Sequence, residues 1–402
     1  MTMFRNIKHH PILHRCDFDI YDLGVGIVNS IRRTILSEIP NIAVSFDPYN
    51  KDMNDTEFLI NTSSLHNEFL GHRLSLIPIC LSAEEIDSFN RDNYLFEIKV
   101  HNKTNLMQPV TTKDIVVTNA EGLGYPLEVC ERLFPKDPIT GDHIIITKLK
   151  PNLFDPSRGE ELHVRFRARK GIARDNACWC PVSMCSYKFI VDNAAAAGAL
   201  TEKLAEVTDE KERDVITKSF NTLEIEKHYI RDANLDPTAY AFSIESECAL
   251  TPHSLFTQAI KVLIRKLYTI SHNEDNKVEI HPINEDTNFY AITIHDEDHT
   301  IGNLLQFYIH AKFVKANKEV TYVGYSVPHP LEREVIVKIK FSNVTDVNGF
   351  LKSTCGFLIN HFELIKTEWH EAMSQTSAVP EPVAAPVAKP SRIIKRAIIK
   401  KK

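Results

Sequence analysis

The chain shows the same order of amphipathic helix and strand twice, far apart in the sequence. In the first copy, residues 21–40 place isoleucine at positions 27, 31, 35 and 39, the spacing of one apolar face of a helix. Residues 41–46 then alternate apolar and polar side chains, as a strand does. In the second copy, apolar residues at helical spacing cover 301–313, and residues 319–327 predict a strand. The chain is therefore expected to contain two distant relatives of one unit.

Each predicted helix has a start signal, and each copy has a closing helix. Asp22 is the expected N-cap of the first helix and Pro40 ends it, whereas Asp298 or Thr300 is the expected N-cap of the second. A further amphipathic helix closes each copy, at residues 255–270 and 346–365. The polar link between the copies, residues 271–277, is short enough to join neighbouring units.

A large insertion interrupts the first copy. Its residues 63–79 predict a helix in which Leu65, Phe69 and Leu76 pack inward, which is a simpler interpretation than an acid–base pair of His66 or His72 with Glu68. Short strands are expected at 94–100, 114–119, 143–149 and 162–168, and one helix at 194–220.

Composition restricts the classes of function. The 402 residues carry a net charge of −6, but residues 376–402 hold seven Lys/Arg and one Glu, so the rest of the chain carries −12. An acidic body disfavours a protein that binds nucleic acid along its whole surface. Residues 1–16 have no apolar core of a signal peptide, and no apolar run approaches the ~20 residues that span a bilayer. The sequence favours an intracellular protein.

The run His295–Asp296–Glu297–Asp298–His299 has the composition of a metal site. Side chains of adjacent residues in an extended segment point to opposite faces, so these five do not converge on one ion without a special loop. Acidic residues before a helix also accept its free N–H groups and oppose its dipole. Capping is the favoured interpretation, and a metal or a contact with a partner's basic residue are the alternatives.

The cysteines cluster once, at Cys178, Cys180 and Cys185. Because no second Cys-x-x-Cys pair and no paired histidine lies nearby, buried thiols are favoured over zinc.

Six motifs carry a resemblance to a known family. The stretches NSIRRTILSEIPNIAV, LHNEFLGHRLSLIPI, GIARDNACWCPVS and FSIESECALTP resemble the alpha-like (archaeal D-like) assembly subunits of multisubunit DNA-dependent RNA polymerases. EDHTIGNLL and the later VGYSVPHPLE resemble the small L-like partner of that subunit. The resemblance leaves out the C-terminal tail and part of residues 194–222.

The resemblance implies a fold class and a domain plan. In the family, two separate chains pair through their helices, so one chain with both sets of motifs implies an α+β fold. In it, two related helix-plus-antiparallel-sheet dimerisation units form an intramolecular pseudo-heterodimer. The implied domains are an alpha-like dimerisation domain (1–46 and 237–272), a mostly β insert domain (47–236), an L-like dimerisation domain (278–372) and a disordered basic tail (373–402).

The resemblance also implies a function. Family members carry the largest and second-largest catalytic subunits and bind small assembly subunits, so this chain is expected to be a non-catalytic scaffold without a cofactor. It would meet DNA and RNA only through the complex and would bind no membrane. Some relatives hold zinc or an iron–sulfur cluster after the HRLSLIP motif, but Cys80 stands alone there and no such group is expected. The fusion resembles that in nucleocytoplasmic large DNA viruses, which places the protein in the host cytoplasm and virion; a cellular protein of this kind belongs in the nucleus.

Two groups of residues are expected to contact partners. On the duplicated helices Arg32 and Arg33 contact a large subunit or form a solvated face, and the strand around residue 165 presents arginines to an acidic protein surface, to nucleic acid or to solvent. The expected contact residues are Ile31, Arg32, Arg33, Ile35, Arg165, Arg167, Arg169, Leu304, Leu305 and Tyr308.

Two rival functions remain at this stage. One is a metal-dependent hydrolase that uses His295, Asp298 and His299. The other is a free transcription factor that binds DNA through the basic tail and residues 165–174, and it predicts salt-sensitive binding by the isolated chain.

Overall fold

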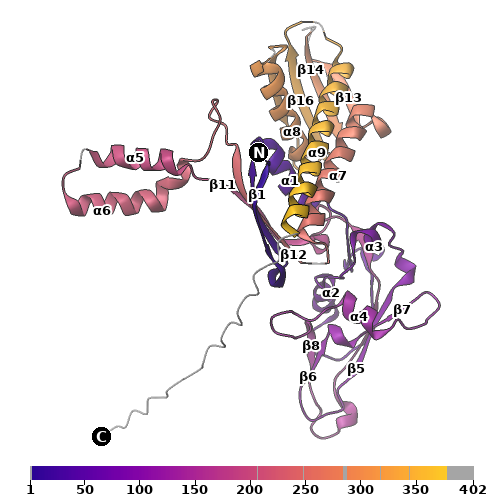
Figure 1. Cartoon of the computed structure of the whole chain (residues 1–402). Helices are drawn as coiled ribbons and strands as arrows, with labels where there is room; N and C mark the ends of the chain where they lie inside the picture. The colour runs from indigo at the N-terminus through magenta and orange to yellow at the C-terminus, as the bar shows by residue number, and fades with distance from the viewer. Residues whose placement is uncertain are drawn as a thin grey trace, which may run out of the picture.

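The structure is a computed structural model that describes residues 2–377 apart from 206, 248, 284–287, 317 and 344. It is a mixed fold of helices and antiparallel sheets (Figure 1). Two four-stranded sheets each carry two long helices on one face, and a third, mostly β region lies below them in this view. None of the described helices is long and apolar enough to cross a membrane.

The first sheet combines two strands from the start of the chain with two strands that lie more than 150 residues later in the sequence. Along β2 the side chains of Cys16, Phe18 and Ile20 are buried while their neighbours reach solvent, so one sheet face is apolar and the helices cover it. This first unit consists of β1 (Phe4–His10), β2 (Arg15–Tyr21), α1 (Val25–Ser37), β11 (Val182–Phe189), β12 (Ala239–Ser246) and α7 (Pro252–His272), in strand order β1-β2-β12-β11.

The second unit follows the same path. Along the chain, a hairpin is followed by a helix, two more strands and a closing helix. In the sheet, the last of the four strands lies between the hairpin and the third strand. The second unit consists of β13 (Val278–Pro282), β14 (Phe289–His295), α8 (His299–Ile309), β15 (Val320–Ser326), β16 (Glu334–Phe341) and α9 (Val347–Ser377), in strand order β13-β14-β16-β15.

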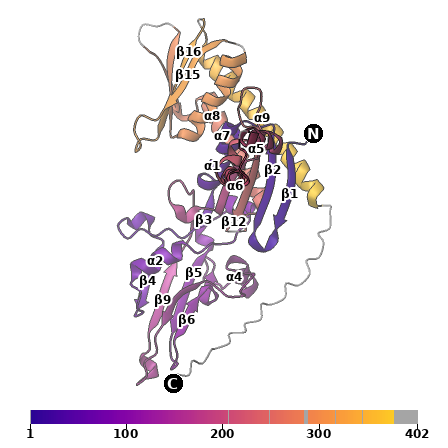
Figure 2. The ribbon, with the colours of Figure 1, turned by 90° about the vertical axis from the view of Figure 1, so that its left-hand side faces the viewer.

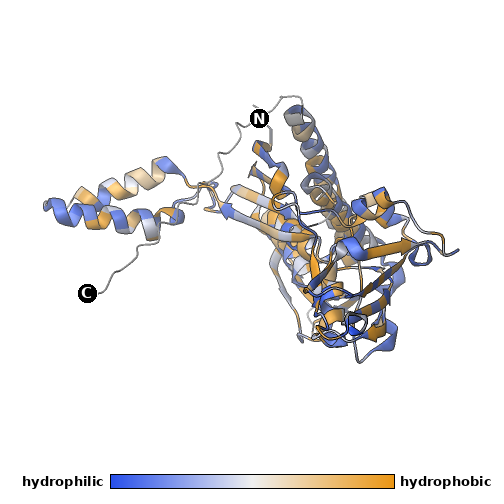
Figure 3. Cartoon of the chain, turned by 90° about the horizontal axis from the view of Figure 1, so that it is seen from below, coloured by the Kyte–Doolittle hydropathy of each residue, from blue (hydrophilic) through white to orange (hydrophobic). Residues whose placement is uncertain are grey.

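The first unit is interrupted twice. Between α1 and β11 lies the middle region, residues 38–181, and between β11 and β12 a pair of helices, α5 (Asn193–Ala205) and α6 (Glu210–Ser219), projects away from the body (Figures 1 and 3). The middle region contains the sheet β4-β9-β5-β7 (Thr56–Asn61, Glu161–Phe166, Leu95–His101, Ile115–Thr118), the pairs β6-β8 (Gln108–Thr111, Ile145–Leu149) and β3-β10 (Asn41–Ala43, Arg169–Gly171), and the helices α2 (Asn67–Ser75), α3 (Ala83–Asp87) and α4 (Leu127–Leu133).

The expected domain boundary is wrong at β11. This strand pairs with β12 along its length, so it belongs to the first sheet although residues 47–236 were assigned to the insertion. The strand expected at 41–46 shortens to β3, which pairs with β10 of the middle region and has every residue buried. An alternating apolar and polar pattern predicts a strand but not the sheet that the strand joins. By position in the sheet, β11 of the first unit corresponds to β15 of the second, and β3 has no such counterpart among the described strands.

Three expected helix limits are also wrong. Asp22 has a φ of +61° and lies before α1, whose N-cap is Gly24, so it does not cap the helix. The single helix expected at 194–220 is two helices, and α6 starts where Asp209 accepts a hydrogen bond from Lys211 N. Helix α9 continues to Ser377 and buries Met373, so residues 373–377 are helical where disorder was expected. Residues 378–402 of the expected tail lie outside the described residues.

Helix α9 extends beyond its own unit and completes the core of the first (Figure 2). The Trp369 ring lies 4.6 Å from the Phe256 ring and 4.7 Å from the Phe18 ring, centroid to centroid, and its Nε1 donates to His253 O at 3.3 Å. The backbone N of Met3 donates to Glu368 at 3.0 Å. We call this group the aromatic cluster: Phe4, Phe18, Phe242, Phe256 and Trp369, all nearly or fully buried.

The aromatic cluster yields a stability prediction. Trp369→Ala removes a fully buried ring and is expected to lower the free energy of unfolding by about 3–5 kcal/mol, measured by denaturant unfolding. Phe357→Ala, on the same helix at a position 52% exposed, is the matched control and should change it by less than about 0.5 kcal/mol. Equal losses in the two variants would show that the cluster does not hold α9 to the first unit.

Candidate functional site

The candidate site is the interface where the helices of the two units meet. Helix α1 of the first unit packs against α8 of the second, and α7 lies along α9, so the four helices gather between the two sheets (Figures 1 and 2). The buried face of α1 includes Ile27, Ile31 and Ile35, and that of α8 includes Ile301, Leu304 and Leu305. The repeated apolar stripe is therefore used inside the chain.

This placement changes the role of several expected contact residues. Ile31, Ile35, Leu304 and Leu305 are all 1% exposed or less, so they form no free surface. Tyr308 is half-buried, and burial raises the pKa of its hydroxyl. The four aliphatic side chains support the junction between the units and are not available to another subunit.

Two glycines allow a close approach between α1 and α8. A Cβ at Gly24 would lie 2.4 Å from Phe307 Cζ, and one at Gly26 would lie 2.7 Å from Phe307 Cγ. Any side chain there would displace the Phe307 ring, so the start of α1 is shaped to receive it.

A buried network of charges joins the units beside this contact. Glu297 is 2% exposed and lies between Lys266 Nζ of α7, at 2.9 Å, and Lys277 Nζ, at 3.4 Å. Lys266 also lies 3.2 Å from Glu38, which in turn pairs with Arg174 at 3.1 Å. We call these five residues the interface ion network. Since each buried charge has a partner of opposite sign, removing one would leave another uncompensated.

Arg174 and Arg33 extend the network to the loop before α8. Arg174 donates to the backbone O of Asp296 at 3.3 Å. Arg33 donates to Asp298 at 3.1 Å and to Thr300 Oγ1 at 2.9 Å. Burial raises the pKa of the Asp298 carboxyl, but the hydrogen bonds from Thr300 and the charges of Arg33 and Lys266 outweigh it, so the pKa lies below its ordinary value. Arg33, one of the two arginines expected to contact a large subunit, therefore binds the second unit within this chain.

The acidic and histidine-rich run begins a helix, as expected. Asp298 is the N-cap of α8 and accepts a hydrogen bond from Thr300 N at 2.7 Å. His295 lies 3.5 Å from both Glu279 and Glu334, and His299 is 3.3 Å from the Tyr325 hydroxyl. Among the described residues, no three His, Cys, Asp or Glu side chains are grouped to hold a metal ion. The hydrolase alternative has no supporting geometry.

The cysteine cluster lies where Trp179 anchors the middle region. The Trp179 indole donates to Arg169 O, and the Cys180 thiol lies 3.2 Å from Val182 O. Burial raises the pKa of Cys178 to about 11 and that of Cys185 to about 12, so both are protonated at neutral pH. Cys185 is buried in the core, and Cys178 and Cys180 are half-buried.

The arginines of the strand around residue 165 already have carboxylate partners. Arg165 pairs with Glu97 at 2.9 Å and Arg167 with Asp92 at 3.1 Å. Arg169 donates to Asp55, whose side chain is fully buried. This basic face is neutralised within the middle region, so a DNA-binding role for it loses its main support. Arg165 and Arg167 remain partly exposed and accessible to a partner.

Helix α2 faces the other way from the sequence expectation. Its buried residues are Leu70 and Leu74, whereas Phe69 and Leu76 are largely exposed. Leu76 lies just after the helix, which runs from Asn67 to Ser75, and Phe69 lies on its exposed face.

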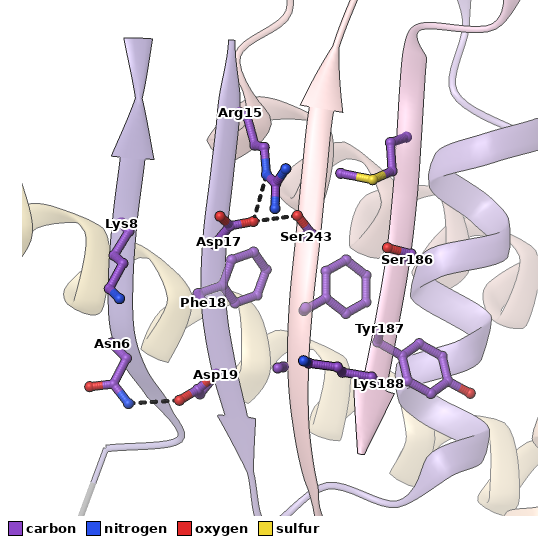
Figure 4. Close-up of a pocket in the computed structure, with 13 residues that line it drawn as sticks. Asn6, Lys8, Arg15, Asp17, Phe18, Asp19, Ser186, Tyr187, Lys188 and Ser243 are labelled. Carbon is purple, nitrogen blue, oxygen red and sulfur yellow. Dashed lines mark hydrogen bonds and ion pairs between the residues drawn. The ribbon is translucent and has the colours of Figure 1, made fainter. Parts of the chain in front are cut away.

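The outer face of the first sheet is an open polar surface (Figure 4). It contains a hollow of about 650 Å³ across the four strands. Arg15 donates to Asp17, which also accepts from Ser243, and Asn6 donates to Asp19. Arg15 and Asp17 pair along β2, and Asp17 and Asp19 accept hydrogen bonds from the neighbouring strands, so the face resembles an ordinary solvated sheet surface more than a reaction centre.

Fold and interface together define a structural protein built from two similar units. A family model described as the RNA polymerase Rpb3/Rpb11 dimerisation domain matches residues 17–267, more than half of the chain, and a second model with the same description matches residues 290–368. The chain belongs to the Rpb3/Rpb11 dimerisation-domain family of RNA polymerase subunits. Subunits of this type are structural assembly subunits and are not catalytic on their own.

Similar proteins are named as subunits of several DNA-directed RNA polymerases. The chain is 26% identical to the DNA-directed RNA polymerases IV and V subunit 3B of Arabidopsis thaliana, over 65% of this chain and 88% of the relative. It is 28% identical to the human DNA-directed RNA polymerases I and III subunit RPAC1, over 65% and 82%. It is 25% identical to the DNA-directed RNA polymerase II subunit RPB3 of Schizosaccharomyces pombe, over 68% and 86%. Each relative is mostly covered, while about a third of this chain has no counterpart in the alignment.

Sequence reasoning missed the interface ion network. Glu297 was noticed only as part of an acidic run, and Glu38, Arg174 and Lys266 were not singled out. A signal existed in part, because Glu38 and Arg174 both lie within motifs that carried the family resemblance. No local pattern in the sequence predicts that Glu38 pairs with Arg174, because the two residues are 136 positions apart.

The interface ion network yields a second prediction. Glu297→Gln keeps the size of the side chain but leaves Lys266 and Lys277 short of a buried partner, so it is expected to lower the free energy of unfolding by about 3 kcal/mol. Glu279→Gln, at a side chain 55% exposed, is the matched control and should cost less than about 1 kcal/mol. Denaturant unfolding of both variants measures the difference, and a mild effect of Glu297→Gln would contradict the network's role.

The lowered pKa of Asp298 gives a pH dependence. The folded state stabilises the ionised Asp298 carboxylate. Its contribution to the free energy of unfolding is therefore fully present above the pKa of the unfolded state, near 3.8, and is lost as the pH falls through the lower pKa of the folded state. Asp298→Asn should therefore destabilise the protein at neutral pH and have a shrinking effect below pH 3.8. Urea unfolding of both proteins across this range is the measurement, and a pH-independent difference would contradict it.

Proposed function

We propose that this chain is an RNA polymerase assembly scaffold in which two fused units replace a pair of separate subunits. The single observation that supports it best is that α9 of the second unit places Trp369 in the core of the first. The two family-model matches fall on the two units in turn. The alpha-like domain then comprises α1, α7 and the sheet β1-β2-β12-β11, with the middle region as its insert, and the L-like domain comprises the second unit.

Fusion makes pairing of the units intramolecular. Helix α7 ends at His272 and β13 starts at Val278, and Asn273 accepts a hydrogen bond from Val278 N at 2.7 Å, so the link turns tightly between them. Short links of this kind give effective concentrations in about the millimolar range. Assembly of the scaffold then no longer depends on two chains meeting in a fixed ratio.

The outer surfaces of this platform are proposed to dock the largest and second-largest polymerase subunits, with small assembly subunits at its margins. Since the aliphatic stripe is buried inside, the docking residues are the half-buried Arg32 and Tyr308 and the partly exposed Arg165 and Arg167. Among the described residues, the Arg32 side chain donates one hydrogen bond, from Nε to Asn29 of its own helix, which leaves the rest of its guanidinium for a carboxylate. DNA and RNA are met through the complex.

A viral origin of the fusion is part of the proposal. The relatives in plants, animals and yeast leave about a third of this chain unmatched, as expected if they lack the second unit. A fused scaffold of the kind found in nucleocytoplasmic large DNA viruses would act in the host cytoplasm and be packaged in the virion, whereas a cellular one would act in the nucleus.

Splitting the chain tests the fused pair. Fragments 1–276 and 277–402, produced together with a tag on the first, are expected to co-purify in equal amounts, because the aromatic cluster and the interface ion network lie between them. Phe307→Asp in the second fragment puts a charge against Gly24 and Gly26 and should reduce recovery about tenfold. Recovery of the first fragment alone from the unchanged pair would refute the proposal.

Docking is tested by charge reversal in the full chain. Arg32→Glu is expected to reduce recovery of the large polymerase subunits with the tagged chain, measured by mass spectrometry, while thermal unfolding stays unchanged. Lys211→Glu, an exposed charge on α6, is the matched control and should leave recovery intact. Full recovery with Arg32→Glu would remove this residue from the docking surface.

A further inference from the structure

An apolar groove lies between the turn of the first hairpin and the middle region. Its volume is about 520 Å³, and its walls include the turn after β1 and the segment after α4. Ile12 and Leu13 come from the turn, and Ile139 and Ile144 come from the middle region; all four are 44–68% exposed. Four aliphatic side chains converging on one open hollow expose more apolar surface than scattered single residues do.

The rim of this groove carries acidic side chains. Glu245, Glu247 and Asp137 line it together with one lysine, Lys136, and Glu247 is exposed. The guanidinium of Arg132, also in the lining, is held by both carboxylate oxygens of Glu85, so its charge is already matched. An occupant with aliphatic side chains flanked by positive charges would complement both the walls and the rim.

The last twelve residues of this chain have that composition. Residues 391–402 read SRIIKRAIIKKK, with paired isoleucines at 393–394 and 398–399 and six Lys/Arg before, between and after the pairs. We propose that residues 391–402 dock in the groove of the same chain, with isoleucines against Ile12, Leu13, Ile139 and Ile144 and basic residues toward Glu245 and Glu247.

The connection is long enough. Near the end of α9, Ala372 and Gln375 lie against the start of β1, at Arg5 and Ile7. From Ile7 the chain reaches Ile12 in five residues, about 17 Å in extended form. Residues 378–392 number fifteen and include four prolines, and at ~3.1 Å per residue such a Pro-rich linker spans about 45 Å. Docking within one chain is therefore sterically allowed and benefits from a high effective concentration.

Docking would tie the middle region to the first unit. The groove is formed by both, so an occupant that contacts both walls restrains their relative position. This effect is separate from the fused pair, because none of the groove residues lies in the aromatic cluster or the interface ion network. The docking can fail while the proposed function stands.

A photocrosslinking experiment on the full chain tests the docking. Benzoylphenylalanine in place of Ile394 is expected, after irradiation and digestion, to link mainly to peptides that contain Leu13 or Ile139. Leu13→Asp should lower the yield about tenfold, the change expected from loss of one buried aliphatic contact, and added salt should lower it further. Leu123→Asp, at a similarly exposed leucine outside the groove, is the matched control and should leave the yield unchanged.

Three outcomes would overturn the proposal. They are crosslinks spread over unrelated peptides, equal yields in the Leu13→Asp and Leu123→Asp variants, and crosslinks that join two chains, which would assign the groove to a second copy. Circular dichroism and thermal unfolding of both variants verify that each remains folded, as expected for substitutions at exposed positions.

Discussion

The carboxylate of Glu297 is the point on which the two halves of this molecule depend. It is buried, it comes from the loop before α8, and both lysines that neutralise it lie outside that loop, one on α7 of the first unit and one at the start of β13. A buried carboxylate without such partners would be protonated or would unfold the loop. Glu38 and Arg174 continue the network to the end of α1 and to the middle region, so one set of charges fixes three parts of the chain relative to each other. Apolar contacts supply most of the stability, while the charges define which surfaces meet.

The apolar contacts follow the same logic. Helix α1 begins with glycines that receive Phe307, and α9 ends by placing Trp369 among the aromatic rings of the first unit. Each unit thus has a helix that completes its neighbour. The common strand order of the two sheets suits this arrangement, because equivalent helices emerge on the same face of each sheet.

The sequence allowed much of the two-unit plan to be predicted, for a physical reason. A helix that buries one face repeats apolar residues at 3.6-residue intervals, so α1, α7, α8 and α9 were all visible. The strand β11 was assigned to the wrong domain because pairing partners are non-local and leave no mark within the strand itself. The hairpin β1–β2 was not expected at all, since its outward face is densely charged and its turn contains Pro11. At the site, Ile31 and Leu305 were recognised as important, but whether they faced a partner or the chain's own second unit could not follow from periodicity. Arg33 and Arg169 seemed free because their acidic partners, Asp298 and Asp55, lie far along the chain.

The contact between Met3 and Glu368 has a consequence for how the protein is made. Met3 and Glu368 are 365 positions apart in the sequence. Close to them, the Trp369 ring contacts the rings of Phe4 and Phe18. At ~5–20 residues per second, a ribosome needs about 20–70 s to travel between them. Throughout that time Phe4 and Phe18 lack the cover that Trp369 supplies, although Phe256 of α7, which also contacts both rings, is made earlier. Truncation near the end of α9 would therefore leave the core of the first unit incomplete.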